Sequence, residues 1–201
     1  QTTEELYLLR RIAVRLGAIT DAVEHEGEAD RLLVSADRNP NSQGARLTGI
    51  AYTEIGISIP SIADGIRAGR IQTLVVFGED VTKIGIDAAL LAKVETLIVS
   101  DILPNATTAA AHFLLPGCAH AEKRGTFING KGRVQKFMKA VEPRGDARPE
   151  WEFLAEVAKA LGTADGFTTI EDLFNRMASE VPALAGVEWS KLGDTGVTVP
   201  V

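Results

Sequence analysis

The sequence predicts an α/β fold: a mostly parallel sheet with helices on both faces, of the Rossmann-like kind. Short apolar runs without polar alternation recur along the first part of the chain, as expected for strands buried on both faces. Segments with helical spacing separate these runs, so successive strands should be parallel and joined by right-handed crossovers. Aromatic residues make up only 5% of the 201 residues, which favours strands under helices over an antiparallel sandwich.

Each expected element follows from a local pattern. Residues 2–17 carry apolar side chains at helical spacing, with Thr2 or Thr3 as the cap and Gly17 as the stop. The other expected helices cover residues 60–70, 85–95, 105–112, 149–162 and 169–181. The expected strands are the apolar runs at residues 31–36, 71–78, 96–100 and 113–117. A polar loop rich in turn formers is expected at residues 37–49.

The stretch GTFINGKGR, residues 125–133, allows two interpretations. It falls one residue short of the phosphate-loop pattern G-x-x-x-x-G-K-[ST], because Gly132 stands where Ser or Thr is needed. Such a loop also needs a buried strand before it and a helix after it, whereas Asn129-Gly130 between two strand-like runs favours a β-hairpin. A free-standing nucleotide-binding module with Lys131 on ATP remains the alternative.

The alternation of predicted strands and helices ends at about residue 118, and this divides the chain. We expect an α/β domain at residues 1–117, a hairpin with a connecting segment packed on it at residues 118–148, and C-terminal helices with a tail at residues 149–201. The chain begins at Gln1, with a helix almost at once, so we expect it to be a piece of a longer protein.

Charge and cysteine content exclude several classes of function. The formal net charge of −6 argues against a nucleic-acid surface, which needs clustered Lys and Arg. Cys118 is the single cysteine, so this chain can form no intrachain disulfide and cannot ligate an iron–sulfur cluster with its own thiolates. No apolar run approaches the roughly 18 residues of a membrane span, so no direct membrane insertion is expected.

Polar residues at the ends of the predicted strands are the candidate ligands, because open α/β sheets bind there. A carboxylate at such an end can bind ribose hydroxyls or a guanine edge, and a threonine at a helix start can meet a phosphate. The alternative is that these residues cap the following helices. The candidates are Asp37, Arg38, Asn39, Glu79, Asp80, Thr82, Asp101, Asn105, Thr107 and Thr108.

A metal site is a weaker interpretation. His112, Cys118 and His120 lie within nine residues of one another, but a structural site needs four ligands, and a catalytic one needs three with supporting partners. We expect no metal ligands here. His112 is expected to close a helix, and Cys118 to be a small buried residue.

A longer pattern, from residue 99 to residue 162, resembles the molybdopterin oxidoreductase superfamily. A strand ends in Asp, a Thr-containing helix follows, and then come Leu-Pro, Glu-Lys-x-Gly-Thr, Asn, Gly-Arg-Val-Gln, Pro-x-Gly and a helix with Trp. The matching residues are Asp101, Thr107, Leu115, Pro116, Glu122, Lys123, Gly125, Thr126, Asn129, Gly132, Arg133, Val134, Gln135, Pro143, Gly145 and Trp151.

Residues 2–17 and LLVSADRNPNSQGA, residues 32–45, narrow the resemblance to the large iron–sulfur (G) subunits of bacterial NADH:quinone oxidoreductases, or respiratory complex I. This implies a structural fragment without catalytic residues or cofactor, inactive alone, that supports electron transfer from NADH to quinone. Iron–sulfur clusters are then expected on upstream cysteines. The implied partners are the other subunits, in the cytoplasmic peripheral arm of an inner-membrane complex.

The alternative implied by the resemblance is a fragment of a molybdopterin-guanine-dinucleotide enzyme similar to formate dehydrogenase. Asp101, Thr107 and Thr108 would then lie on the guanine nucleotide, and Arg133 near the pterin. Molybdenum enzymes commonly carry Gly-x-Asn-Pro where this chain has Gly78-Glu79-Asp80-Val81. Two acidic side chains would repel a pyrophosphate, which favours an empty site.

Overall fold

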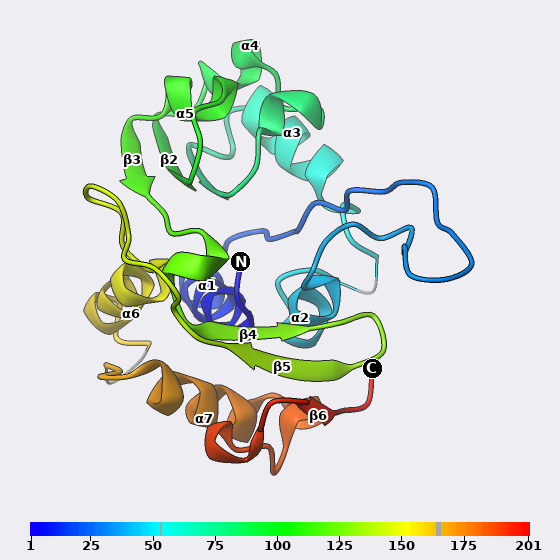
Figure 1. Ribbon diagram of the computed structural model, residues 1–201. Coiled ribbons are helices and arrows are strands. Elements are labelled where there is room, and N and C mark those ends of the chain that lie inside the picture. Colours follow the sequence, from blue (N-terminus) through cyan, green and yellow to red (C-terminus); the bar gives the residue numbers. More distant parts are fainter. Residues whose placement is uncertain (53, 164–165) are drawn as a thin grey trace.

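The computed structural model describes residues 1–52, 54–163 and 166–201. The chain is arranged in two parts (Figure 1), an α/β unit and a second part of helices on an antiparallel sheet. The described residues contain no helix long and apolar enough to cross a membrane.

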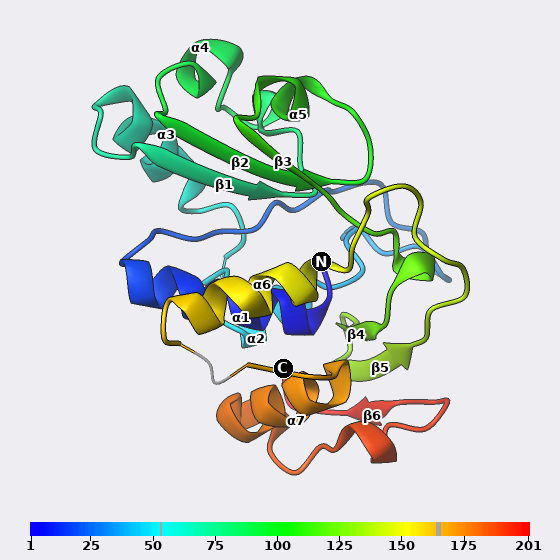
Figure 2. The same ribbon diagram turned by 90° about the vertical axis from the view of Figure 1, so that its left-hand side faces the viewer.

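The α/β unit confirms the predicted fold class. Its strands run parallel in the order β1-β2-β3, with Val75 opposite Ile98 and Val99 opposite Leu114. The helices α3, α4 and α5 lie over one face of the sheet, and α1 (Thr3–Leu16) and α6 (Glu150–Ala160) lie on the other side (Figure 2). Leu97 and Val99 are fully buried in its core. The elements are α3 (Ile59–Arg67), β1 (Thr73–Phe77), η1 (Val81–Lys83), α4 (Ala88–Leu91), β2 (Thr96–Asp101), α5 (Ala106–Ala110) and β3 (Phe113–Pro116).

The second part is built around a larger core in which Leu8, Leu173 and Phe174 are fully buried. Its β4 and β5 form the predicted hairpin, and β6 extends that sheet beside β5. A small third core joins α1 to α2. The elements are α1 (Thr3–Leu16), α2 (Ser42–Leu47), η2 (His120–Glu122), β4 (Gly125–Ile128), β5 (Arg133–Phe137), α6 (Glu150–Ala160), α7 (Ile170–Glu180), η3 (Pro182–Leu184), η4 (Trp189–Lys191) and β6 (Val197–Thr198).

Local signals explain the ends of the main helices. The Thr2 side chain accepts a hydrogen bond from the Glu5 amide, and the Glu5 carboxylate accepts one from the Thr2 amide, which closes a capping box at α1. Gly17 ends α1 with a φ of 65°, which a residue with a Cβ rarely adopts. Thr169 caps α7, because its hydroxyl accepts a hydrogen bond from the Asp172 amide at 3.1 Å.

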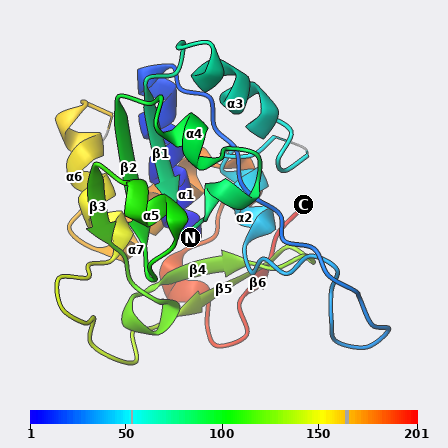
Figure 3. The same cartoon turned by 90° about the horizontal axis from the view of Figure 1, so that it is seen from above.

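The predicted strand at residues 31–36 is wrong. These residues belong to an exposed arm, residues 24–38, which projects from the body of the molecule (Figure 3). Leu32 is 84% exposed and Leu33 is 90% exposed. The apolar run is real, but acidic residues flank it, and the described chain supplies no strand beside it. An apolar run predicts burial only where a neighbouring element covers it.

Three smaller differences have local causes. Residues 42–47, within the predicted polar loop, form α2. The helix expected at residues 85–95 shortens to α4, which Asp87 caps. His112 follows α5 but does not close it, because its ring Nδ1 accepts a hydrogen bond from the Leu97 amide at 2.8 Å and so joins β2. In addition, β6 forms in the C-terminal tail, where no pattern of apolar residues predicted a strand.

Candidate functional site

A cavity of about 410 Å³ lies beyond the carboxyl ends of β1 and β2. Gly78 and Asp101 contribute to it from those strand ends, and Lys123 and Glu150 contribute from the second part. The strands point toward the second part (Figure 1), so the cavity lies where the two parts meet. This is the edge at which parallel sheets bind ligands.

Asp101 reaches the cavity and also shapes the loop after β2. Its Oδ1 accepts hydrogen bonds from the amides of Ile102, at 2.7 Å, and Leu103, at 3.3 Å. Its Oδ2 accepts one from the Asn105 side-chain amide at 2.8 Å. A carboxylate has about four acceptor positions, so the half-buried Asp101 retains one for a ligand. The loop it holds presents Ile102 and Leu103 as the exposed apolar rim of the cavity.

Thr107 and Thr108 use their hydroxyl groups within the protein. Thr107 is fully buried; its Oγ1 donates to Asp80 Oδ1 at 3.0 Å and accepts from the Val81 amide at 3.0 Å. The Thr108 hydroxyl accepts from the Asn105 amide at 2.7 Å, and the Asn105 side chain accepts from the Thr108 amide. The two residues therefore anchor α5 beside the cavity, without a hydroxyl left over for a phosphate.

The two acidic residues after β1 do not line the cavity. Glu79 accepts a hydrogen bond from His25 Nε2 at 2.7 Å. Asp80 accepts one from the Thr82 hydroxyl at 2.7 Å and pairs with Lys83 at 3.3 Å. The Thr82 hydrogen bond, with smaller contributions from Thr107 and Lys83, lowers the pKa of Asp80 to about 2. Both carboxylates are engaged by their own surroundings.

Three charged side chains form a buried network below the cavity. Lys123 Nζ lies 2.8 Å from Glu5 Oε1 and 2.7 Å from Glu150 Oε2, and all three side chains are at most 5% exposed. Burial favours a lower pKa for Lys123, but the two carboxylates outweigh it and raise the pKa. Burial, and then the Glu5 carboxylate, raise the pKa of Glu150. All three protons of the ammonium group face these carboxylates, so none is left for a ligand.

The same segment fixes the hairpin to α1. Glu4 Oε2 accepts from the Thr126 amide at 3.0 Å, and Glu4 Oε1 accepts from the Thr126 hydroxyl at 2.9 Å. Burial raises the pKa of Glu4 to about 7, although these hydrogen bonds oppose the rise. A Cβ at Gly125 would come within 2.6 Å of Thr2 Cγ2. The signature residues Lys123, Gly125 and Thr126 therefore join the hairpin to the first helix.

Arg133 lies on β5, outside the cavity lining. Its guanidinium donates to the Thr195 carbonyl at 2.9 Å. The structure therefore brings Asp101 to the cavity, sets Thr107 and Thr108 beside it and leaves Arg133 in the other sheet. Sequence reasoning missed Lys123 and Glu150 as cavity residues, because charged residues without an apolar pattern are usually on the surface.

The GTFINGKGR stretch is a hairpin rather than a phosphate loop. Asn129 Oδ1 accepts hydrogen bonds from the amides of Lys131 and Arg133, and Gly132 has a φ of 74°. The strand β5 follows the turn where a phosphate loop has a helix. Lys131 is exposed, and the cavity lining does not include it.

Across residues 1–52, 54–163 and 166–201, no three His, Cys, Asp or Glu side chains are grouped so that they could hold a metal ion. Cys118 is buried, as predicted, and burial with the nearby Glu150 carboxylate raises the pKa of its thiol to about 11. A neutral thiol is a poor nucleophile and metal ligand.

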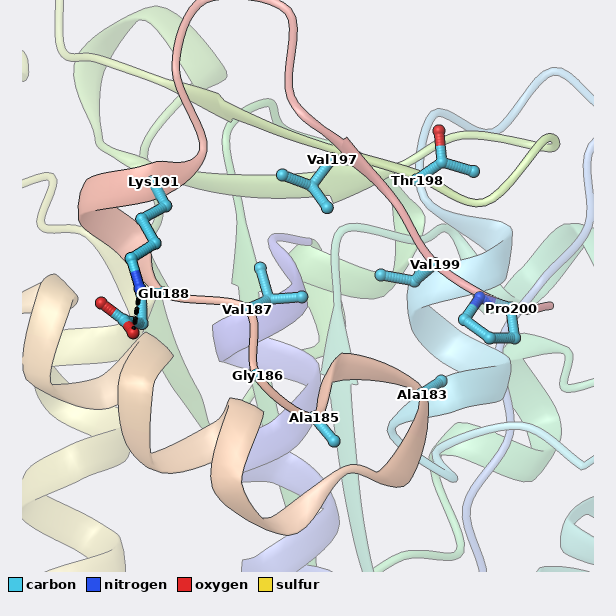
Figure 4. Close-up of a pocket in the computed structure, with 10 residues that line it drawn as sticks. All are labelled: Ala183, Ala185, Gly186, Val187, Glu188, Lys191, Val197, Thr198, Val199 and Pro200. Carbon is cyan, nitrogen blue, oxygen red and sulfur yellow. Dashed lines mark hydrogen bonds and ion pairs between the residues drawn. The ribbon is translucent and has the colours of Figure 1, made fainter.

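A second hollow, of about 330 Å³, lies between η3, η4 and β6 (Figure 4). Its walls are mainly small and apolar side chains such as Val187, Val197 and Pro200, with the Glu188–Lys191 ion pair on one side. It contains none of the predicted ligand residues. The cavity at the sheet edge is therefore the candidate site.

The fold, and a cavity at the carboxyl edge of a parallel sheet, define an α/β domain with a candidate binding site at its strand ends. Residues 3–160 match the molybdopterin oxidoreductase family, and the chain belongs to that family. It is 32% identical over 154 residues to the F420-dependent formate dehydrogenase 2 subunit alpha of Methanococcus maripaludis, covering 73% of this chain and 22% of that protein.

The F420-dependent formate dehydrogenase subunit alpha of Methanocaldococcus jannaschii is 32% identical over 171 residues, covering 82% of this chain and 23% of that protein. This chain thus spans less than a quarter of either relative. Acetylene hydratase from Pelobacter acetylenicus shares the fold, with a TM-score of 0.53 and 16% identity over 71% of this chain and 21% of that one.

The relatives support the alternative expectation drawn from the sequence better than the main one. Both are formate dehydrogenase alpha subunits by name. They favour the molybdopterin-guanine-dinucleotide alternative over the expected NADH:quinone oxidoreductase subunit, and they give no support to a link with NADH or quinone.

Proposed function

We propose that this chain is the part of a formate dehydrogenase-type molybdopterin oxidoreductase that forms a wall around the nucleotide end of the cofactor. The observation that carries the proposal is the cavity beyond β1 and β2, with Asp101 on its wall. When bound, such a cofactor supplies the metal centre for two-electron oxidation. The residues of this chain bind and orient its far end.

The cavity fits the base of a guanine nucleotide. Asp101 retains one acceptor position, and the side-chain oxygen of Gln1, also in the lining, has no hydrogen-bond partner within the described residues. Two acceptors match the N–H groups on the guanine edge. The exposed Ile102 and Leu103 offer an apolar surface to the flat ring. Gly78 keeps the wall thin, because a Cβ there would meet the Gln1 amide at 3.1 Å.

The cavity does not fit the pyrophosphate of a dinucleotide. Among the residues that the structure describes, Lys123 is the one Lys or Arg in its lining, and Glu5 and Glu150 take up all its protons. A doubly charged pyrophosphate would meet Asp101 and Glu150 instead of a free cation. We therefore assign only the base end to this cavity and derive no step at the pyrophosphate.

No unpaired Lys or Arg lines this cavity in the part of the chain that the structure describes, which supports a second candidate function. A domain of this family that no longer holds a cofactor would serve as a scaffold, as in the large subunit of an NADH:quinone oxidoreductase. The engaged Lys123 and the acidic pair Glu79 and Asp80 are consistent with such a role.

The two candidates differ in the composition of the full-length protein. Its molybdenum content is measured by mass spectrometry, and its guanine nucleotide by chromatography after acid release. The first proposal predicts both, and a loss of most of the nucleotide in Asp101→Asn, which keeps one oxygen for the loop amides. Asp87→Asn is the matched control, because Asp87 also caps a backbone amide, at 2.9 Å, but lies outside the cavity lining.

Three outcomes are distinct. A wild-type protein without molybdenum or nucleotide supports the scaffold. Nucleotide that survives Asp101→Asn as well as it survives Asp87→Asn contradicts the assignment of the base to this cavity. Loss in Asp101→Asn alone supports the first proposal.

A further inference from the structure

We propose that the arm, residues 24–38, docks onto a second protein chain and inserts Leu32 and Leu33 into an apolar socket rimmed by basic side chains. This inference rests on the proposed function in one respect: a formate dehydrogenase-type alpha subunit works beside other subunits. It concerns a different surface from the cavity and a different class of ligand.

The tip of the arm exposes apolar side chains that belong to none of the three cores. Leu32 and Leu33 are 84% and 90% exposed, and Val34 beside them is 38% exposed. Single exposed leucines are common on protein surfaces, but a run of them at a projecting tip marks an interaction site. Figure 3 shows the arm extending away from both sheets, so it is placed to reach a neighbour.

The tip has a fixed shape rather than a loose one. Asp30 Oδ1 accepts hydrogen bonds from the amides of Leu32, Leu33 and Val34, at 2.7 to 2.8 Å. The Asp30 amide in turn donates to the Val34 carbonyl at 3.0 Å. One carboxylate thus holds the turn that presents both leucines. A loop already in its bound shape loses less entropy on binding.

The stem of the arm is held as well. Backbone hydrogen bonds join Gly27 to Ala36, at 2.9 Å, and Arg38 to His25, at 2.8 Å. The Arg38 guanidinium crosses the stem and donates to the Glu28 carbonyl at 2.6 Å. Gly27 permits this crossing, because a Cβ there would come within 2.5 Å of Arg38 Nε. His25 ties the stem to Glu79 on the body.

The charge of the arm indicates the chemistry of its partner. Residues 24–38 contain five acidic and two basic residues, which leaves a net charge of −3. Arg38 is engaged in the stem, and Arg31 is exposed next to Leu32. Glu26 and Glu28 are exposed beside the tip. Complementarity then requires basic side chains around the socket, which also disfavours an anionic lipid surface as the partner.

The experiment uses the full-length protein, produced in its own host with its natural partners. A photo-reactive benzoylphenylalanine replaces Leu33, and a second sample carries it at Leu16, which is 61% exposed on α1. The inference predicts a cross-link from position 33 to another chain, and none from position 16 to that chain. A cross-link within the same polypeptide, a cross-link to lipid or no cross-link at position 33 would overturn it.

Substitution provides an independent measurement. Leu32→Ser with Leu33→Ser should leave the melting temperature unchanged and reduce the co-purified partner at least roughly tenfold, as expected for the centre of an interface. Asp30→Ala, which keeps both leucines but frees the turn, should give a smaller loss. Full retention of the partner in the double variant contradicts the inference.

The molybdenum content of the same samples separates the two proposals. Protein with benzoylphenylalanine at position 33 that contains molybdenum but forms no cross-link contradicts the docking inference alone. The same protein, cross-linked to another chain but without molybdenum, contradicts the proposed function alone.

Discussion

Below the cavity, Lys123 is buried between Glu5 and Glu150, whereas at the tip of the arm Leu32 and Leu33 stand almost fully in solvent. Each region reverses the usual place of its residue type. The charged residues can be buried because their hydrogen bonds are satisfied by one another. The leucines are exposed although a carboxylate fixes their turn. A residue whose interactions are satisfied within the chain is structural, whatever its type. A residue that is held in place but left exposed is a candidate for recognition.

Removing the buried cation should have the largest effect on stability. Lys123→Met removes the cation shared by two buried carboxylates, so we expect the free energy of unfolding to fall by about 3–5 kcal/mol. Urea denaturation measures it. Lys191→Met is the control: Lys191 also pairs with a glutamate, at 2.6 Å, but the pair is exposed, and its loss should cost at most about 1 kcal/mol. Equal losses in both variants would show that the buried network does not support the fold.

Glu4 tests the pH dependence of the buried region. Its pKa is raised from 4.5 to about 7 in the folded protein. The stabilisation from this protonated carboxyl is therefore complete below pH 4.5 and is lost as the pH rises to 7. The loss amounts to about 3 kcal/mol.

Glu4→Gln keeps an acceptor for Thr126 and cannot ionise. The free energy of unfolding of the Glu4→Gln variant should therefore fall less than that of the wild type between pH 4.5 and pH 8. The difference between the two pH profiles, from chemical denaturation, isolates Glu4 from the other titrating groups. Parallel profiles would contradict the raised pKa.

Gly125 tests the close contact between the hairpin and α1. Gly125→Ala places a Cβ within 2.6 Å of Thr2 Cγ2, so we expect a loss of about 1–3 kcal/mol from overpacking. Gly130→Ala, in the same hairpin, is the matched control, because a Cβ there meets nothing within 4 Å. Thermal unfolding compares the two. A larger shift for Gly130→Ala would mean that the turn, not the contact, limits stability.

The smallest change in the free energy of unfolding is expected at the arm, in contrast to the buried network. Leu33→Ser should change the free energy of unfolding by no more than about 0.5 kcal/mol, because the side chain packs against none of the three cores. Differential scanning calorimetry is sufficient. A loss of more than about 1 kcal/mol would place Leu33 in a core contact within this chain.

Local patterns predicted most of the fold. The strands β1, β2 and β3, the hairpin and the helices α1, α6 and α7 follow from apolar spacing, caps and turn residues that act within a few positions. The strand expected at residues 31–36 failed because an apolar run does not reveal whether another element covers it. Two residues of β6 depend on pairing with β5, across more than 60 positions, and left no local signal.

The candidate site was predictable in part. Asp101 ends an apolar strand, and this position was sufficient to predict that it lies at the carboxyl edge of the sheet. Lys123 and Glu150 are 27 positions apart and meet only in the folded chain, so no spacing could indicate their pairing. The hydroxyl groups of Thr107 and Thr108 looked available in the sequence, but the folded chain engages both.

The proposed function places the base of a guanine nucleotide in the cavity beside Asp101. The most direct test is an experimental structure of the full-length protein, purified with whatever cofactor it carries. We expect a purine ring against Leu103, with its N–H edge within hydrogen-bonding distance of Asp101. A cavity filled by side chains from the rest of the polypeptide, or a dinucleotide bound elsewhere, would contradict it.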